Sequence, residues 1–543
     1  MRKIIGLWSG HDASFVVLDE GVPIIHTEAE RHLRVKEPPA DSIKMFYEHY
    51  GITQGVIGLS TCWMPKGIKD HSASWDKIKD LAALTVVGHH QAHAANAFYS
   101  SNFHDAIIIT VDGGGIENES GLCVGASVWK GYATSITNID YIPLERMNIG
   151  GVWSRTTRHI FGYESGFPQG NQCGTTMALA ALGDPNKYLA DFKKMLTTDL
   201  AHAVSRAPGH VAGMSVKDPK NPKHPYHERF AQIARDDNQA KYDMAASMQL
   251  ATEHMLRDLI ANSLDKDPQC KNLCISGGVA LNSVAMGKIR DWFPQLENVF
   301  IPPIPYDAGL TIGSAQYTWH HVMKNFRVHW LDNAKPYLGK HYSTEEVMST
   351  IDKYVGLSQV TLENVSDETV IDLLDKGKIV SVFNRRAESG RRALGNRSIL
   401  ADPRNPWTKD QVNDKVKHRQ WFRPFAPSIM REKVGEWFTT DCDSPYMGFV
   451  LKFKEEKKNS VPAVVHFDGT ARLQTVTERD NHWYYNFLKQ WEAKTGVPIL
   501  LNTSYNDKEP IVETPDHALK CFLGTAIDAL YFPEHGFLVK KKT

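Results

Sequence analysis

The sequence predicts an α/β protein with more than one domain, and three observations lead to this fold class. Apolar runs of strand length alternate with segments of helical periodicity along most of the chain. Three of these runs end in a glycine or aspartate turn that leads into a helix, as in nucleotide-binding α/β folds. A chain of 543 residues exceeds one hydrophobic core, so we expect roughly two to four domains.

The first segment predicts a β-meander. Strand-like runs at residues 4–8, 14–18 and 24–27 are separated by turns, the first of which reads SGHD and contains His11 and Asp12. From about residue 39, helical and strand patterns alternate, with the next predicted strand at residues 56–60. The α/β pattern therefore begins after the meander.

The stretch HHQAHAANAF, which begins at His89, predicts a helix with metal-ligand spacing. His89 and His93 stand four residues apart in an alanine-rich run, so a helix would present both imidazoles on one face. The predicted strand 107–111 then leads to Asp112, whose carboxylate could complete a two-histidine, one-carboxylate site. Histidine pairs at this spacing are also common without a metal, so a purely structural role is the alternative.

Glycine turns follow this strand and a later one. Three glycines from Gly113 come directly after Asp112, and they would let backbone N–H groups approach a phosphate. A helix at residues 242–265 precedes the second strand, 273–275, which ends in Gly277 and Gly278. The candidate nucleotide-binding residues are the glycines of these two turns and the residue at the start of the next helix: Gly113, Gly114, Gly277, Gly278 and Asn282.

Two further predictions concern helix starts. A third strand, 299–301, leads through prolines to Asp307 at the N-terminus of a helix, where it could be a fourth ligand to a metal or phosphate. Thr175 or Thr176 could cap a helix that extends to residue 182.

A domain boundary is predicted in residues 325–342, where periodicity is weak and Pro336 occurs. We therefore divide the chain into domains 1–335 and 336–543. In the second domain, predicted helices at residues 345–355 and 369–376 precede a strand at residues 379–383, so the α/β alternation resumes.

The C-terminal domain contains an arginine-rich motif, NRRAESGRRALGNRSILADPR, at residues 384–404. Guanidinium groups match phosphate or carboxylate oxygens in pairs, so this motif suits an oxyanion with more than one charge. Three more polar motifs follow it, KHRQWFRPFAPSI, HFDGTARLQTV and NTSYNDKEPIV. Together they predict one polar pocket, although a solvated charged surface is the alternative reading of the arginines.

Composition excludes several function classes. The 62 basic residues equal the 62 acidic residues, so the overall charge favours neither nucleic acid nor an anionic membrane as a partner. The first residues hold only a short apolar piece, and no later run reaches membrane-spanning length. Seven scattered cysteines fit a reducing compartment. We expect a cytoplasmic protein.

These motifs, in this order, resemble the O-carbamoyltransferases of antibiotic and nodulation-factor biosynthesis. The resemblance spans nearly the whole chain, from GLWSGHDAS through HHQAH, TVDGGG, SGGVALN and PYDAGL to RRALGNRSILADPR, WFRPFAP, HFDGTAR and NTSYN. It implies an N-terminal actin/sugar-kinase-like domain, similar to the universal tRNA threonylcarbamoyl-transfer protein, and a C-terminal YrdC-like α/β domain.

The resemblance also implies a transferase of one-carbon groups with two half-reactions. Carbamoyl phosphate and ATP, with Mg²⁺, would form a carbamoyl adenylate in the C-terminal domain. The N-terminal domain would transfer the carbamoyl group to a hydroxyl of a small-molecule acceptor. The implied metal is Fe(II), or another divalent ion, at His89, His93, Asp112 and Asp307. The implied carbamoyl phosphate site is Arg392, Lys417, Arg472 and Ser504, and the implied adenine-side loop is Gly277, Gly278 and Asn282.

Several alternatives stay open from the sequence. His11 matches a histidine near the acceptor hydroxyl, but either His11 or Asp12 could be the general base. An actin-fold small-molecule kinase, a non-catalytic nucleotide-binding protein and threonylcarbamoyl transfer to tRNA are the competing functions. The acceptor is open, and residues 205–236 could form either a loop that selects it or a solvated excursion. The chain could also form a homodimer.

Overall fold

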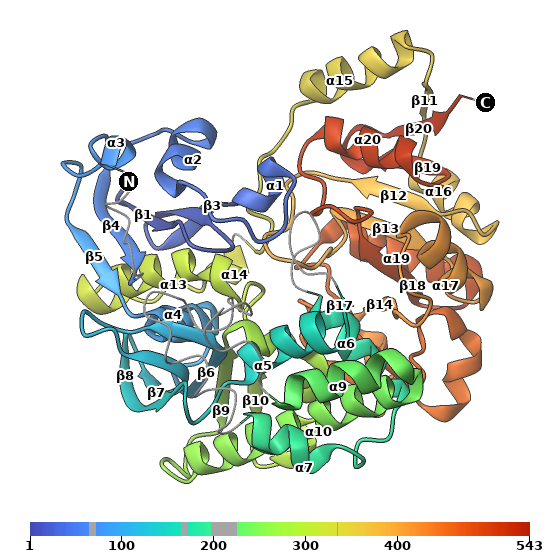
Figure 1. The fold of residues 1–543 in the computed structure, drawn as a ribbon. Coiled ribbons are helices and arrows are strands. Elements are labelled where there is room, and N and C mark those ends of the chain that lie inside the picture. Colours follow the sequence, from blue (N-terminus) through green and yellow to red (C-terminus); the bar gives the residue numbers. More distant parts are fainter. Residues whose placement is uncertain (64–71, 164–171, 197–224, 334, 543) are drawn as a thin grey trace. The chain divides into compact units, whose positions relative to one another are not determined.

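The computed structural model describes residues 1–63, 72–163, 172–196, 225–333 and 335–542 (Figure 1). The chain divides into two compact units, Met1–Lys335 and Pro336–Thr543. Each unit is described by itself below.

The first sheet of the N-terminal unit follows the predicted meander. Its strands are β1 (Lys3–Trp8), β2 (Ser14–Asp19), β3 (Val22–Glu28), β4 (Val56–Cys62) and β5 (Leu84–Val87). Their order is β3-β2-β1-β4-β5, in which β1, β2 and β3 are antiparallel neighbours and β4 and β5 run parallel to β1. All six residues of β1 are buried, as expected for a central strand of mostly apolar residues.

The second sheet repeats this arrangement. Its strands are β6 (Asp105–Ile116), β7 (Cys123–Tyr132), β8 (Ser135–Pro143), β9 (Asn272–Ser276) and β10 (Asn298–Phe300). Read from β8, the order is β8-β7-β6-β9-β10, again with an antiparallel meander and two strands parallel to the first. Two sheets of the same topology in one unit confirm the predicted actin/sugar-kinase-like fold.

Two helices connect the sheets of the N-terminal unit. Helix α4 (His89–Ser100) packs on β6 and β9, helix α13 (Leu310–Gln316) packs on β1, β2 and β4, and the two helices pack on each other (Figure 1). Their approach is close because Gly313 has no side chain: a Cβ there would lie 1.9 Å from the Ala92 carbonyl oxygen. The alanines and glycines of these helices therefore set the spacing of the layers.

The remaining described helices of this unit cover the sheets or the segments between them. They are α1 (Ala29–Leu33), α2 (Ser42–His49), α3 (Ser72–Trp75), α5 (Ile149–Arg155), α6 (Cys173–Leu179), α7 (Leu189–Lys194), α9 (Pro225–Asp236), α10 (Asn238–Leu264), α11 (Ser283–Gly287), α12 (Ile289–Trp292) and α14 (Trp330–Asn333). The long α10 confirms the helix predicted at residues 242–265.

Two local predictions are wrong. Neither Thr175 nor Thr176 caps a helix, because α6 begins earlier, at Cys173, and Gln172 holds the cap position. The hydroxyl of Thr176 instead lies 2.7 Å from that of Thr157. Within the segment 205–236, residues 225–236 form helix α9 rather than a loop, and residues 205–224 lie outside the described residues.

The C-terminal unit is a mixed α/β domain around an eight-stranded sheet with the order β11-β20-β19-β12-β13-β18-β14-β17. These strands are β11 (Val360–Asn364), β12 (Val380–Phe383), β13 (Arg397–Ala401), β14 (Ala426–Met430), β17 (Gln474–Val476), β18 (Ile499–Ser504), β19 (Ala529–Phe532) and β20 (Phe537–Lys541); a separate pair is β15 (Val450–Lys452) and β16 (Thr470–Arg472). Its helices are α15 (Thr344–Gly356), α16 (Asp367–Asp375), α17 (Trp407–Gln411), α18 (Val434–Trp437), α19 (His482–Thr495) and α20 (Pro515–Gly524). Apolar residues of α16, α19 and the central strands form its core.

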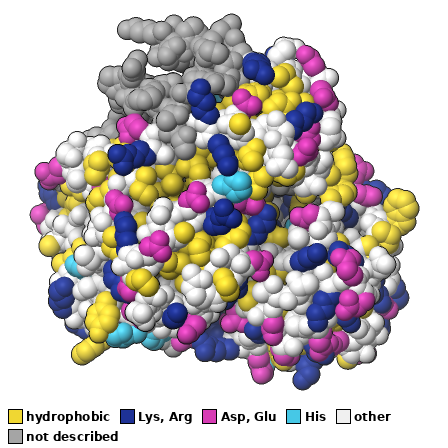
Figure 2. Space-filling model, turned by 90° about the horizontal axis from the view of Figure 1, so that it is seen from below, with side chains coloured by type: hydrophobic (Ala, Val, Ile, Leu, Met, Phe, Trp, Pro, Cys, Tyr) yellow, Lys and Arg dark blue, Asp and Glu magenta, His cyan; other side chains and the backbone are white. Residues whose placement is uncertain are grey.

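The surface agrees with the balanced composition. On the face drawn in Figure 2, basic and acidic side chains are interspersed rather than gathered into a field of one sign. Among the described residues, no helix combines the length and apolar character that crossing a bilayer requires.

Candidate functional site

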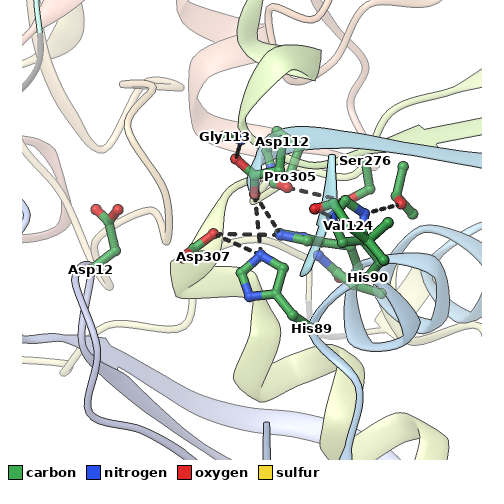
Figure 3. A network of polar contacts seen from close by, with 12 residues as sticks. Asp12, His89, His90, Asp112, Gly113, Val124, Ser276, Pro305 and Asp307 are labelled. Carbon is green, nitrogen blue, oxygen red and sulfur yellow. Dashed lines mark hydrogen bonds and ion pairs between the residues drawn. The ribbon is translucent and has the colours of Figure 1, made fainter. Parts of the chain in front are cut away.

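The four predicted metal ligands converge at one point of the N-terminal unit. His89 and His93 project from α4, Asp112 from β6, and Asp307 from the turn before α13. The Nε2 atom of His93 lies 2.9 Å from Oδ2 of Asp112 and 3.4 Å from Oδ1 of Asp307. For His89 the corresponding distances are 3.4 and 3.7 Å. Figure 3 shows Asp112 and Asp307 meeting at the ring of His89.

This donor set fits a divalent transition metal. One donor atom from each side chain can be chosen so that all four lie within 4.8 Å of one another. With metal–ligand bonds of about 2.1 Å, neighbouring donors would be about 3.4 Å apart in a tetrahedral site and about 3.0 Å apart in an octahedral one. The observed separations span these values. Two imidazoles with two carboxylates suit iron, zinc, cobalt or manganese better than calcium.

The electrostatics of the cluster also call for a cation. Burial alone would raise the pKa of Asp112, but hydrogen bonds from His89 and His93 hold it well below its usual value. Burial would likewise lower the pKa of His93, yet its bonds to Asp112 and Asp307 raise it to about 9. The Asp112 carboxylate is therefore stabilised as an anion and the His93 ring as a cation, and a bound metal ion would take over the positive charge.

His11 and Asp12 lie beside this cluster. Nδ1 of His11 is 3.0 Å from Oδ2 of Asp12, and its Nε2 is 3.1 Å from Oδ2 of Asp307. Burial disfavours the imidazolium of His11, but the charge of Asp307 and the hydrogen bond to Asp12 raise its pKa to about 10. A cation held by Asp307 would offset the largest of these charges and return His11 toward neutrality. Asp12 has φ +57°, so the turn backbone is strained to place this pair.

The glycine turns are packed directly against these ligands. A Cβ on Gly115 would lie 2.2 Å from the His89 ring, so only glycine leaves room for the imidazole. A Cβ on Gly277, which has φ +95°, would meet the Val111 carbonyl oxygen at 2.2 Å. A Cβ on Gly278 would be 3.0 Å from Oδ1 of Asp112. The parallel neighbours β6 and β9 thus bring the two predicted glycine turns side by side.

The other predicted nucleotide-binding residues have local partners. The backbone N–H of Gly113 donates to Oδ1 of Asp112 at 2.6 Å, and Gly114 has φ +127° within a bulge of β6. Strand β6 therefore continues through the glycines and does not end at Asp112. The Asn282 side chain caps α11 and exchanges two hydrogen bonds with Gln249. Its contact with a nucleotide stays a prediction.

The middle histidine of the HHQAH motif has a structural role. His90 is fully buried, its Nε2 lies 2.8 Å from the Val124 carbonyl oxygen, and its Nδ1 lies 2.6 Å from the Thr110 hydroxyl. Nε2 must carry the proton, because a carbonyl oxygen can only accept. Burial, followed by the charges of His89 and His93, lowers the pKa of His90 to about 3. This neutral ring anchors α4 to the sheet.

Both ends of α4 are held by charged side chains that sequence reasoning missed, the buried Glu117 and the half-buried Arg327. At the N-terminus, the backbone N–H of His90 donates to the carboxylate of Glu117. At the C-terminus, the Arg327 guanidinium donates to the carbonyl oxygens of Phe98 at 2.5 Å and Ser101 at 2.6 Å. Each charge interacts favourably with the helix dipole, because the negative Glu117 lies at the N-terminus and the positive Arg327 at the C-terminus. Glu117 stands two residues after Gly115, so its place beside the glycines was a usable signal in the sequence, whereas nothing in the sequence marked Arg327.

In the C-terminal unit, Lys417 and Ser504 lie together. The Lys417 ammonium is 3.2 Å from the Ser504 hydroxyl, 2.5 Å from the Ser504 carbonyl oxygen and 2.6 Å from the side-chain oxygen of Asn506. Asn502, two residues earlier in β18, donates to the carbonyl oxygen of Ala393, the residue after Arg392. The strand end and the arginine-rich motif are therefore adjacent.

Arg392 and Arg472 belong to a cation cluster, which we define as Arg392, Arg419, Arg423 and Arg472. Burial, then the charges of Arg392 and Arg423, hold the pKa of Arg472 well below its usual range. The pKa of Arg419 is also held well below its usual range, first by burial and then by the charges of Arg423 and Arg472. Nε of Arg472 is buried and has no hydrogen-bond partner in the part of the chain that the structure describes. Half-buried guanidinium groups that repel one another, with a donor left open on Arg472, suit an anionic ligand. In the sequence, Arg419 and Arg423 stand out only as members of the motif KHRQWFRPFAPSI.

The loop that carries Arg392 is held by Glu388. One carboxylate oxygen of this buried residue accepts hydrogen bonds from the backbone N–H groups of Leu394 at 2.7 Å, Asn396 at 2.7 Å and Arg397 at 3.2 Å. Because three backbone N–H groups donate to one oxygen, the carboxylate fixes the conformation of the turn at residues 394–397, much as a bound phosphate can fix a loop. Sequence reasoning missed Glu388, although it stands inside the arginine-rich motif.

Comparisons with known proteins agree with both units. Family models described as carbamoyltransferase N-terminus and carbamoyltransferase C-terminus match residues 52–316 and 371–541. The chain is 34% identical to the uncharacterized protein sll1178 of Synechocystis sp., over 98% of this chain and 95% of that protein. It is 30% identical to nodulation protein NolO of Bradyrhizobium diazoefficiens, over 84% of this chain and 79% of NolO.

A second nodulation protein and one solved structure were also similar. Nodulation protein NolNO of Sinorhizobium fredii is 30% identical over 98% of this chain and 79% of its own length. The solved structure of HypF from T. kodakarensis covers 59% of this chain and 48% of its own, at 14% identity and a TM-score of 0.36. That structural likeness is too remote to bear on function. The two family models and the relatives show that the chain belongs to the carbamoyltransferase family, as an enzyme that transfers carbamoyl groups.

Proposed function

We propose that this enzyme is an ATP-dependent O-carbamoyltransferase with two half-reactions. The observation that carries the proposal is the cluster of His89, His93, Asp112 and Asp307 with His11 beside it, in a chain of the carbamoyltransferase family. The cation cluster in the C-terminal unit supports a separate site for phosphate-bearing substrates. The proposed activity therefore uses both units of the chain.

The first half-reaction is proposed for the C-terminal unit. Water hydrolyses carbamoyl phosphate to carbamate and inorganic phosphate, and an oxygen of the carbamate then attacks the α-phosphorus of Mg²⁺-bound ATP. Pyrophosphate leaves and carbamoyl adenylate forms. Arg392, Arg472, Lys417 and Ser504 would hold the phosphate groups, because two half-buried guanidinium groups, a buried ammonium and a hydroxyl supply charge-assisted hydrogen bonds.

The second half-reaction is proposed for the N-terminal unit. The acceptor hydroxyl attacks the carbamoyl carbon, the bond from that carbon to the phosphate oxygen breaks, and AMP leaves. Iron(II), or another divalent ion with the same donor preference, would be held by the four ligands and would polarise the carbamoyl carbonyl as a Lewis acid. The β6 bulge with Gly113 and Gly114 and the turn with Gly277 and Gly278 would lie against the adenylate. The backbone N–H groups of Gly114 and Gly278 would be the donors, because those of Gly113 and Gly277 already donate to Asp112 and to the Pro305 carbonyl oxygen.

The geometry favours His11 over Asp12 as the group that accepts the hydroxyl proton. Asp12 contacts Nδ1 of His11, so it can orient the ring and leave Nε2 facing the cluster. The same division of roles, a base oriented by a carboxylate, occurs in many hydrolytic sites. We therefore assign His11 as the base and Asp12 as its positioning partner.

The acceptor is proposed to be a hydroxyl of a natural product or sugar. A tRNA acceptor would require a basic surface, and the chain carries equal numbers of basic and acidic residues. Testing different hydroxyl compounds with preformed carbamoyl adenylate would identify the class that accepts the carbamoyl group.

One assay separates this function from the alternatives. The protein is incubated with ATP, Mg²⁺, Fe²⁺ and carbamoyl phosphate, and the products are identified by mass spectrometry. Pyrophosphate with carbamoyl adenylate is the expected result. ADP would indicate a kinase, and binding without any product would indicate a nucleotide-binding protein.

Two variants test the separation of the half-reactions. Asp112→Asn should stop transfer to the acceptor while adenylate still forms, and Arg392→Ala should stop adenylate formation while added adenylate is still used. Arg404→Ala is the matched arginine control, since its guanidinium is paired with Asp402 and Asp375. Loss of both steps in each variant would contradict two separate sites.

A further inference from the structure

Two aromatic side chains stand exposed next to the cation cluster. Trp421 is 56% exposed and Phe467 is 50% exposed, and their ring centroids are 5.5 Å apart at an interplanar angle of 82°. Large aromatic surface left in water at a fixed position is typical of a binding site rather than of an ordinary surface.

The backbone beneath both rings is held in place. The side-chain amide of Asn413 donates to the carbonyl oxygens of Trp421 at 3.4 Å and Arg423 at 2.9 Å, and its oxygen accepts from Arg419. Phe467 lies in a tight turn between His466 and Thr470, closed by two backbone hydrogen bonds. The two rings therefore form a preorganised platform, which we call the aromatic platform.

Positive charge borders this platform. The Lys409 ammonium lies 4.2 Å from the centroid of the Phe467 ring. Trp421 stands between Arg419 and Arg423 in the sequence, and Arg472 ends the strand that follows the Phe467 turn. Asp468 is the acidic residue of that turn, and its carboxylate accepts from the Thr470 hydroxyl. The platform is thus the apolar margin of the cation cluster.

Only one class of proposed substrate combines an aromatic face with several negative charges. Carbamoyl phosphate has the charge but no ring, and a neutral sugar has neither. We propose that the aromatic platform binds the purine base of ATP, with the Trp421 indole stacked on the base and the Phe467 ring edge-on beside it, while the cation cluster holds the phosphates. This inference rests on the proposed activating role of the C-terminal unit and identifies the residues that would select the nucleotide.

The test compares ATP with inorganic triphosphate, which has the charges but no base. In the pyrophosphate-release assay, Trp421→Ala should raise the KM for ATP about 5- to 150-fold, the range for loss of one aromatic–base stack. The inhibition constant of triphosphate and the KM for carbamoyl phosphate should stay unchanged. Phe467→Ala should act in the same direction, and Trp421→Tyr should recover most of the affinity.

Trp407→Ala is the control, because Trp407 is an exposed tryptophan of the same unit, 67% exposed, outside the platform. An unchanged KM for ATP in Trp421→Ala would overturn the proposal. So would an equal weakening of ATP and triphosphate, which would show that the ring only supports the arginines. A raised KM for the acceptor instead would place the acceptor there and overturn it as well.

Failure of the platform and failure of the proposed function are distinguishable. If wild-type protein forms no pyrophosphate, the proposed function fails, and calorimetry of ATP and triphosphate binding to wild type and Trp421→Ala still decides whether the platform binds the base. If pyrophosphate forms normally in Trp421→Ala at low ATP, the platform fails and the proposed function stands.

Discussion

Replacing Gly115 with alanine should disable the proposed metal site without removing any of its four proposed ligands. The new Cβ would lie 2.2 Å from the His89 ring, whereas an ordinary contact is about 3.4 Å or longer. The ring or the strand must therefore move by about 1.2 Å. His89 cannot simply retreat, because α4 is anchored by His90 below it and by Glu117 and Arg327 at its ends.

A shift of this size is large for a metal ligand. Bonds from protein ligands to metals hold to within about 0.2 Å, so displacement of His89 by about 1 Å removes one of four ligands. We expect iron(II) affinity to fall about 100-fold, which corresponds to about 2.7 kcal/mol. Overpacking should also lower the unfolding free energy by about 1–3 kcal/mol.

The assay is iron(II) binding by equilibrium dialysis under anaerobic conditions, followed by carbamoyl transfer at saturating iron. Gly113→Ala is the matched control for metal binding, because a Cβ there would meet its nearest neighbour at 3.6 Å. If Gly115→Ala bound iron as tightly as wild type, the assignment of His89 as a ligand, or the rigidity of α4, would be refuted.

Three further predictions follow from the contacts around the two sites. Glu117→Gln and Arg327→Leu should each lower the unfolding free energy by about 1–3 kcal/mol in urea titrations, because each removes a charged group that is hydrogen-bonded to the backbone at one end of α4; unchanged stability would contradict the capping roles. Glu388→Ala should raise the KM for carbamoyl phosphate more than the KM for ATP, since it releases the turn after Arg392; equal increases would argue against this positioning role. Chelation of iron should lower the melting temperature of wild type but not of Asp112→Asn, because a ligand that binds only the folded state stabilises it, and similar shifts in both proteins would count against iron at this cluster.

The sequence predicted the α/β class and most elements because periodicity and turn residues are local properties. The helix that begins at His89, strand β9 and the long helix α10 formed where their patterns indicated, whereas β6 continues through the glycines at which its predicted strand ends. The prediction that Thr175 or Thr176 caps a helix was wrong, and the reason is also local. Several polar residues near that position could start a helix, and their patterns do not decide between neighbouring starts.

By itself, the sequence determined the chemical types at the site and their local spacing. His89 and His93 lie one helical turn apart because α-helix geometry requires it, and Asp307 stands at a helix start because the prolines before it prevent an earlier one. Only the tertiary structure decided that Asp307 lies within 3.4 Å of His93, that Arg327 closes α4, and that four arginines share one cluster. These contacts depend on how the two sheets, and the loops of the C-terminal unit, pack across long stretches of chain, and packing at that range leaves no periodic signal in the sequence.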